Sequence, residues 1–245
     1  MDKFGYNASK IKGLKMESPK NLKSVEIGQR ILSKNDKVAM ELRKIYAKEN
    51  LFVLNLMSSP GSGKTTLLEN IAKNKLLEFS VIEGDLQTNR DAERLQAYGV
   101  NAHQITTGDA CHLEAAMVQE SLEKLRAQGE FKDFLFIENV GNLVCPASYD
   151  LGANMNIVLL STPEGDDKVL KYPTIFLCAD AVILSKADLI EVFDFKVAQV
   201  EEDLKKLKKE IPLFLISSKD IESQRKFCTF LQQNKERNYV SSHTF

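Results

Sequence analysis

The chain has 245 residues, of which 43% are hydrophobic and 27% are charged. Its 33 basic and 34 acidic side chains give a formal net charge of -1, which offers no reason to expect a nucleic-acid or membrane partner. No apolar run approaches the roughly 20 residues needed to cross a bilayer. Residues 1–23 also lack the apolar core of a secretory signal. We therefore expect a cytoplasmic protein.

The N-terminal part is predicted to differ from the rest of the chain. Residues 1–23 are rich in lysine and poor in apolar side chains, which predicts a flexible tail. Residues 24–50 carry apolar side chains at roughly helical spacing, which predicts a helical extension of one long helix or two shorter ones. The remaining residues, 51–245, are predicted to form one domain.

Strand-like and helix-like segments alternate through this domain. The first strand, 51–57, is almost continuously apolar, as expected of a strand buried on both faces. Further strands are predicted at 79–83, 102–106, 134–137, 157–160, 181–184 and 213–216. Helices are predicted from residue 64 and at 88–98, 112–128, 195–209 and 224–236. This alternation predicts a doubly wound, mostly parallel sheet of the α/β class.

A glycine-rich segment joins the first predicted strand to the next predicted helix. Such a strand–loop–helix context is what a P-loop requires, although an ordinary glycine-rich turn is the alternative. We expect Lys64 to reach the β- and γ-phosphates of a nucleoside triphosphate and Thr65 to ligate Mg²⁺. Ser58 stands where the usual pattern has its first glycine. The expected phosphate-binding residues are Gly61, Ser62, Gly63, Lys64, Thr65 and Thr66.

Three more short elements follow predicted strands, in the order found in G proteins. Glu138 and Gly141 resemble the metal-side element, with Glu in place of the more usual Asp. The segment Ser185-Lys186-Ala187-Asp188 resembles the guanine-reading element, and Ser217-Ser218-Lys219 resembles the S-A-K loop. Each lies at the carboxyl end of a predicted strand, where open α/β sheets bind their ligands.

The guanine-reading role follows from hydrogen-bonding chemistry. Asp188 can accept hydrogen bonds from guanine N1–H and N2–H₂, and adenine lacks both donors. The stem of Lys186 can cover the ring face, while the loop containing Ser218 and Lys219 can contact guanine O6 through its backbone. We therefore expect GTP or GDP, with Mg²⁺, as the bound nucleotide.

Longer stretches are similar to the HypB family, which are P-loop NTPases of the SIMIBI class. They are SSPGSGKTTLLE, EGDLQTNRDAERL, HQITTGDACHLEA, IENVGNLVCPASYDLG, PEGDDKVLKYP and SKADL. The resemblance implies a GTPase that assists nickel insertion into [NiFe]-hydrogenase and, in some bacteria, urease. It also implies a homodimer when GTP is bound, a HypA-like metallochaperone partner, and work within the hydrogenase or urease maturation machinery.

The resemblance further assigns roles to single residues. It implies that Asp85, in EGD, lies near the Mg²⁺ and the switch region, and that Glu138 lies beside the same ion. Lys64, Asp85 and Glu138 are then the expected catalytic residues. Thr65, Asp85 and Glu138 would hold Mg²⁺ directly or through water. We identify no catalytic glutamine or arginine finger, so slow hydrolysis is expected.

Two cysteines and a histidine suggest a second metal site. Cys111, His112 and Cys145 offer ligands that suit Ni²⁺, or Zn²⁺ as the alternative. From their chemistry alone, packing as small buried side chains is the commoner role of cysteines. The resemblance favours the metal site, which two chains could complete together across a two-fold axis. Cys178 and Cys228 are expected to be ordinary packing residues.

The sequence is compatible with two alternative functions. The first is an ATP-dependent kinase or another P-loop ATPase. The second is a metal-storage module whose nucleotide site is vestigial, although the N-terminal segment has neither a cysteine motif nor a histidine-rich tract.

Overall fold

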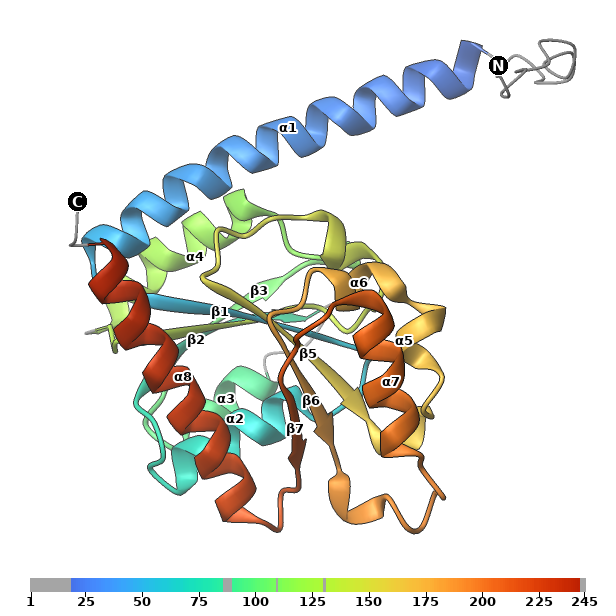
Figure 1. Cartoon of the computed structure of the whole chain (residues 1–245). Coiled ribbons are helices and arrows are strands. Elements are labelled where there is room, and N and C mark those ends of the chain that lie inside the picture. Colours follow the sequence, from blue (N-terminus) through green and yellow to red (C-terminus); the bar gives the residue numbers. More distant parts are fainter. Residues whose placement is uncertain (1–18, 86–89, 109, 130, 243–245) are drawn as a thin grey trace, which may run out of the picture. The chain divides into compact units, whose positions relative to one another are not determined.

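In the residues that the structure describes, seven parallel strands form one sheet in the order β3-β2-β4-β1-β5-β6-β7 (Figure 1). The structure is a computed structural model and describes residues 19–85, 90–108, 110–129 and 131–242. The strands are β1 (Phe52–Ser58), β2 (Phe79–Asp85), β3 (Asn101–Thr106), β4 (Phe134–Glu138), β5 (Met155–Ser161), β6 (Ala181–Ser185) and β7 (Leu213–Ile216). The predicted doubly wound parallel α/β fold is confirmed, and each predicted strand overlaps an observed one.

The central strand β1 explains why the sheet is assembled in this order. All seven of its residues are buried, and it pairs with β4 along one edge and β5 along the other. Side chains alternate between the two faces of a strand. Leu54 therefore packs into the core on one face, while Val53 packs into the core on the other. This placement brings the end of β1 to the middle of the carboxyl edge of the sheet.

Helices cover both faces of the sheet, as Figure 1 shows. One core lies beneath α2 (Lys64–Lys73), α3 (Arg90–Gln96) and α8 (Ile221–Ser242). The opposite face is covered by residues 35–48 together with α4 (Ala115–Gln128), α5 (Lys168–Lys171), α6 (Pro173–Leu177) and α7 (Val197–Leu207). The sequence did not predict α5 and α6, because a helix of four or five residues is too short to display a hydrophobic period.

The helix that follows the Cys111-His112 pair begins later than predicted. The expected start was residue 112, whereas α4 begins at Ala115 after Glu114 in an extended conformation. Cys111 and His112 therefore belong to the turn before the helix and do not open it. Apolar side chains at helical spacing indicate the helix over residues 115–125, but nothing in the local sequence marks Ala115 as its first residue. The backbone N–H of Ala115 donates a hydrogen bond to the side chain of Asn35, which is distant in the sequence.

The N-terminal helix α1 (Pro19–Lys48) is continuous. Residues 19–23, predicted as part of a flexible tail, are helical, and Pro19 suits the first turn of a helix because no backbone N–H is needed there. The rest of the predicted tail, residues 1–18, lies outside the described residues. The chain divides into two units inside α1, residues 1–34 and residues 35–245, and every site below lies in the second. No helix in the described ranges is long and apolar enough to cross a membrane.

Candidate functional site

The phosphate loop connects the end of β1 to the start of α2. Gly61 and Gly63 have φ angles of +71° and +95°, which glycine adopts without the steric cost that other residues incur. Between them, Ser62 is fully buried and donates a 2.8 Å hydrogen bond to the carbonyl of Ser59. The Ser185 hydroxyl donates a 2.6 Å bond to the carbonyl of Ser62. The shape of the loop is thus fixed by the protein itself.

The irregular position in the motif has a definite role in the structure. Ser58 is fully buried at the end of β1, and its hydroxyl oxygen accepts a 3.0 Å hydrogen bond from Lys64 Nζ. Lys64 is only 8% exposed, so this contact gives its buried ammonium group a partner. A glycine at position 58 could not provide that oxygen.

Beside Lys64, a pocket of about 340 Å³ is lined by acidic side chains at the ends of β2 and β4. The Thr65 hydroxyl lies 2.8 Å from Glu138 Oε1 and 3.3 Å from Asp91 Oδ2. Asp85 lines the same pocket. The structure therefore brings together Thr65, Asp85 and Glu138, as the sequence predicted, and adds Asp91, which the sequence analysis missed.

A further carboxyl group in this pocket, Glu83, was also missed. Glu83 and Glu138 occupy the same register position on the paired strands β2 and β4, and they are 2% and 4% exposed. The motif EGD contained the signal, because residues 83 and 85 must point to the same side of their strand. Burial, and secondarily the charge of Glu138, raises the pKa of Glu83 to about 9. Burial raises the pKa of Glu138 as well.

These carboxyl groups fit a divalent cation. Glu83 and Glu138 each have one buried oxygen with no hydrogen-bond partner among the described residues. Two neighbouring buried carboxylates repel one another, and a cation of charge two would compensate them. Carboxylate and hydroxyl oxygens are the protein ligands that Mg²⁺ prefers. The donor set of Thr65, Asp85 and Glu138 is therefore suited to Mg²⁺.

The predicted guanine-reading residues form a connected group. Asp188 accepts hydrogen bonds from Ser217 Oγ at 2.9 Å and from Lys219 Nζ at 2.7 Å. These bonds, chiefly the one from Lys219, lower the pKa of Asp188, so its carboxylate is ionised and can only accept hydrogen bonds. Lys186 adopts a left-handed conformation (φ +56°), and its Nζ donates a 2.8 Å bond to the carbonyl of Gly61. This contact joins the guanine-reading element to the phosphate loop.

A small pocket of about 130 Å³ lies next to this group. Its lining includes Thr66 and Ser218, both predicted from the sequence, and Gln224 from α8, which was not. Gln224 is 1% exposed and donates a 2.9 Å hydrogen bond to the carbonyl of Ser217. The first turns of α8 thereby hold the backbone of the predicted S-A-K loop in place.

The three predicted soft-metal ligands lie together. Cys111 Sγ is 2.8 Å from Cys145 Sγ and 3.8 Å from His112 Nδ1, and one ligand atom from each residue lies within 4.8 Å of the other two. All the cysteines are free thiols. Cys178, half-buried, and Cys228, buried with its pKa raised to about 12, take no part in the cluster.

The protonation states around this cluster suit metal binding. Burial lowers the pKa of His112, which favours the neutral imidazole that ligates metals. The contact with Cys111 raises the pKa of Cys145, so two thiolates side by side need a cation to compensate them. His112 also stacks on Tyr149, with ring centroids 3.7 Å apart and planes inclined by 20°. Tyr149 was missed, because nothing in its local sequence indicates this partner.

A buried side chain connects the two sites. Asn139 follows Glu138 and is fully buried, and its Oδ1 accepts hydrogen bonds from the backbone N–H groups of Val140 at 2.9 Å and Leu113 at 3.3 Å. Leu113 follows His112 directly. The strand end that carries the acidic pocket is thus hydrogen-bonded to the segment that carries Cys111 and His112.

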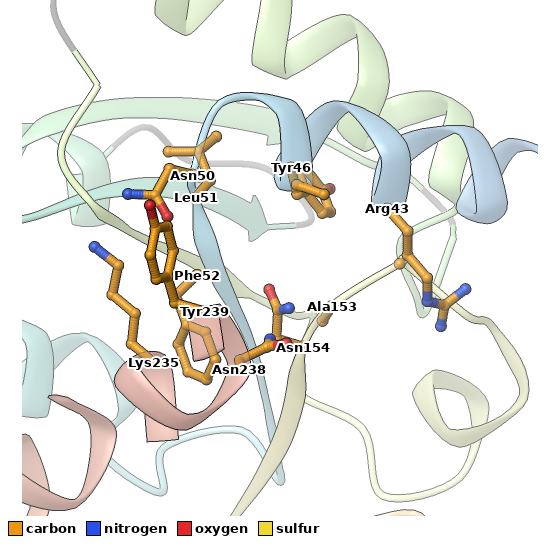
Figure 2. Close-up of a pocket in the computed structure, with 12 residues that line it drawn as sticks. Arg43, Tyr46, Asn50, Leu51, Phe52, Ala153, Asn154, Lys235, Asn238 and Tyr239 are labelled. Carbon is orange, nitrogen blue, oxygen red and sulfur yellow. The ribbon is translucent and has the colours of Figure 1, made fainter. Parts of the chain in front are cut away.

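A separate cleft of about 460 Å³ opens at the other end of β1 (Figure 2). Figure 2 shows Tyr46 on α1, Phe52 at the start of β1, and Lys235 and Tyr239 on α8 around it. This cleft lies at the amino end of the strand, whereas parallel α/β sheets bind their ligands at the carboxyl ends, where the phosphate loop lies.

Comparison with known proteins agrees with this geometry. The sequence profile described as "CobW/HypB/UreG, nucleotide-binding domain" matches residues 52–214. The chain is 64% identical over 225 residues to the hydrogenase/urease maturation factor HypB of Helicobacter pylori, covering 91% of this chain and 93% of that one. It is 58% identical over 241 residues to the HypB of Helicobacter hepaticus, covering 98% and 100%. Its structure resembles that of Helicobacter pylori HypB in complex with nickel, with a TM-score of 0.82, 64% identity, and coverage of 86% and 100%.

Proposed function

This chain belongs to the HypB branch of the CobW/HypB/UreG family, and we propose that it is a slow GTPase that delivers nickel during maturation of [NiFe]-hydrogenase or urease. One observation supports the proposal most strongly. The segment that carries Cys111 and His112 is hydrogen-bonded, through the backbone N–H of Leu113 and the side chain of Asn139, to the strand end that carries Glu138. A soft-metal site and a nucleotide site are therefore physically connected within one domain.

The nucleotide chemistry follows from the residues of the phosphate pocket. Lys64 exchanges its contact with Ser58 for the β- and γ-phosphate oxygens of GTP, and Asp188 selects the guanine base. Thr65, Asp85 and Glu138 would hold Mg²⁺, which would compensate the negative charge at the γ-phosphate. Arg94, which also lines the pocket, is bonded to Glu69 and Asp91. Because these bonds occupy its guanidinium group, Arg94 does not serve as an arginine finger that stabilises the transition state, and this is consistent with slow intrinsic hydrolysis.

Nickel is the cargo of this mechanism and not a resident cofactor. Cys111, His112 and Cys145 provide three ligands, with Zn²⁺ as a competing metal. Three ligands leave the coordination open, so a second chain or a HypA-like metallochaperone can supply or receive the remaining ones. We propose that the GTP-bound protein is a homodimer and that it works in the cytoplasm.

The coupling between the two sites is proposed to run through the ends of β2 and β4. We propose that nucleotide binding orders the segment after Glu138, as γ-phosphate contacts do in other nucleotide switches. Residues 139–145 then carry the change to Cys145. Gly141 supports this path, because a Cβ atom at this position would lie 2.8 Å from the backbone of Pro60 in the phosphate loop. The two loops are therefore packed directly against each other.

Metal titration of the GDP form and of a form with a non-hydrolysable GTP analogue tests the proposal. We expect Ni²⁺ affinity or stoichiometry to differ between the two forms, with a monomer–dimer shift measured by light scattering on the same samples. Cys145→Ala should weaken nickel binding, whereas Cys178→Ala should not, because Cys178 lies outside the cluster. Identical nickel binding in both nucleotide forms would contradict the coupling.

Competition between nucleotides separates this proposal from the ATPase or kinase alternative. GTP should displace a fluorescent GDP analogue at concentrations at which ATP does not. Preference for ATP would favour the alternative, and negligible GTP hydrolysis in the presence of Mg²⁺ and Ni²⁺ would favour the metal-storage module.

A further inference from the structure

Asn35 is a buried polar residue on α1 that neither the nucleotide mechanism nor the metal ligands account for. It is 5% exposed, and both ends of its side-chain amide are used. Nδ2 donates a 2.8 Å hydrogen bond to the carbonyl of Asp150, 115 residues away in the sequence. Oδ1 accepts a 2.8 Å hydrogen bond from the backbone N–H of Ala115, 80 residues away. The donor and acceptor requirements of the two partners fix the orientation of the amide.

The two segments that Asn35 joins are those that carry the soft-metal ligands. Ala115 is the first residue of α4 and lies three positions after His112. Asp150 ends a short segment that begins at Cys145 and includes Tyr149, whose ring stacks on His112. One side chain therefore connects the Cys111-His112 turn to the segment that carries Cys145.

The contact to Ala115 satisfies a requirement of the helix itself. The first N–H groups of a helix have no partner within it and need a capping group. Glu114, at the N-cap of α4, forms no side-chain capping hydrogen bond. Asn35 supplies the missing acceptor from another helix, and so determines where α4 begins relative to His112.

The Asp150 segment is held against α1 by further contacts. Arg43 makes two 2.8 Å hydrogen bonds to the Asp150 carboxylate, and Asp150 also accepts a 2.9 Å bond from the N–H of Gly152. A Cβ atom on Gly152 would lie 2.7 Å from the carbonyl oxygen of Ala39, so this segment packs directly on the α1 backbone. The position of Cys145 is therefore tied to α1 through the six-residue segment from Cys145 to Asp150.

We infer that Asn35 is a positioning residue for the nickel site, which sets the distance between Cys145 and the Cys111-His112 turn by bridging their two segments. The inference rests on the proposed metal role of these three residues. It assigns to the part of α1 within residues 35–48 a function in metal binding beyond covering the sheet. Asn35 touches no metal ligand atom, and it acts through the backbone of the segments that carry them.

Two variants distinguish the contributions of the two Asn35 hydrogen bonds. Asn35→Ala removes both hydrogen bonds. Asn35→Asp keeps an acceptor for the N–H of Ala115, where a negative charge is also favourable at a helix N-terminus, but removes the donor to Asp150. Asp36→Ala is the matched control, because Asp36 is the next residue on the same helix and is exposed.

The experiment titrates each reduced protein with Ni²⁺ alone and records the thiolate-to-nickel charge-transfer absorption together with the affinity. Loss of a contact that positions metal ligands typically weakens metal binding by at least about tenfold, and we expect that loss in both Asn35 variants, with an altered charge-transfer spectrum. GDP affinity should stay within about twofold of the wild type, because the bridge does not reach the nucleotide pocket. Asp36→Ala should match the wild type in every measurement.

Three results would overturn the inference. The first is wild-type nickel affinity and spectrum in Asn35→Ala. The second is wild-type nickel affinity and spectrum in Asn35→Asp when Asn35→Ala has lost both. In that case only the hydrogen bond to Ala115 would matter, and Asn35 would be no more than a helix cap. The third is an equal loss of GDP and Ni²⁺ affinity, which would indicate general destabilisation. Cys145→Ala identifies a different failure: if it binds nickel normally, the proposed metal site itself is wrong.

Discussion

The hydroxyl of Thr65, at the start of α2, donates a 2.8 Å hydrogen bond to the carboxylate of Glu138, at the end of β4. The phosphate loop and a neighbouring strand end are thereby joined at the point where Mg²⁺ is proposed to bind. A metal ion bound to the Thr65 hydroxyl oxygen would therefore lie close to the Glu138 carboxylate, and β4 would not need to move.

Thr65→Ala should therefore abolish the effect of Mg²⁺ on nucleotide binding. We expect GTP affinity to fall by about tenfold or more in the presence of Mg²⁺ and to change little in EDTA, because only the metal ligand is removed. Isothermal titration in the two buffers measures this difference. Thr229→Ala, at an exposed position on α8, is the control. Equal losses in both buffers would argue against Thr65 as a metal ligand.

Replacement of Glu83 by Gln should stabilise the metal-free protein at alkaline pH. The pKa of Glu83 is about 9 in the folded protein against an ordinary value of 4.5, so the folded state binds more protons than the unfolded state between these pH values. The free energy of unfolding therefore falls as pH rises through this window. Gln mimics the neutral acid at every pH, so the variant should lose this dependence.

Thermal unfolding without Mg²⁺ measures the effect. At about pH 8 we expect a Tm increase of roughly 5 °C, which corresponds to about 1.5 kcal/mol for a chain of this size. At about pH 5 the difference should be small. Glu123→Gln, exposed on α4, should leave Tm unchanged at both pH values. A Glu83→Gln protein that is less stable at pH 8 would contradict the raised pKa.

Asp188→Asn should change which base the protein binds. Asn presents an amide N–H to the base where Asp188 presents a second acceptor oxygen, which suits the carbonyl of xanthine and opposes the amino group of guanine. We expect GDP affinity to fall by about 100-fold and xanthosine diphosphate to bind more tightly than GDP. Asp194→Asn, at an exposed site, is the control. Unchanged preference for guanine would refute the role of Asp188.

Nickel affinity should rise with pH. Cysteine binds nickel as the thiolate, and the contact with Cys111 raises the pKa of Cys145 above its ordinary value of 9.0, so nickel must displace protons in the neutral range. We expect apparent affinity to increase by about tenfold per pH unit for each thiol proton released. Titrations between about pH 6.5 and pH 8 measure this slope. It should decrease by one proton in Cys145→Ala and stay the same in Cys178→Ala.

The sequence predicted the architecture well because burial leaves a strong pattern in parallel strands. The central strand is apolar throughout, and the glycine loop, Asp188 and the Ser218 loop each follow a strand directly. Strand ends converge on one edge of a parallel sheet, so local motifs were enough to indicate a shared nucleotide site. The departure at Ser58 is explained by its hydrogen bond to Lys64.

What the sequence could not predict depends on contacts between distant residues. Nothing near Tyr149 indicates that its ring stacks on His112, and nothing near Asn35 indicates a partner at Ala115. The helix α4 begins at the residue that makes this second contact. The raised pKa of Glu83 likewise follows from burial between two strands, which becomes visible only once β2 is paired with β4.

The shared acceptor on Asn139 has a consequence for amide hydrogen exchange. Its Oδ1 receives the N–H groups of both Leu113 and Val140, so any opening that displaces the Asn139 side chain exposes both amides at once. The two protons should exchange with solvent as a correlated pair although they are separated by 26 residues of sequence. If nucleotide binding orders the end of β4, exchange at Leu113 should slow. The amide of Leu113 would then report the state of the phosphate pocket beside the proposed nickel ligands, with no probe attached.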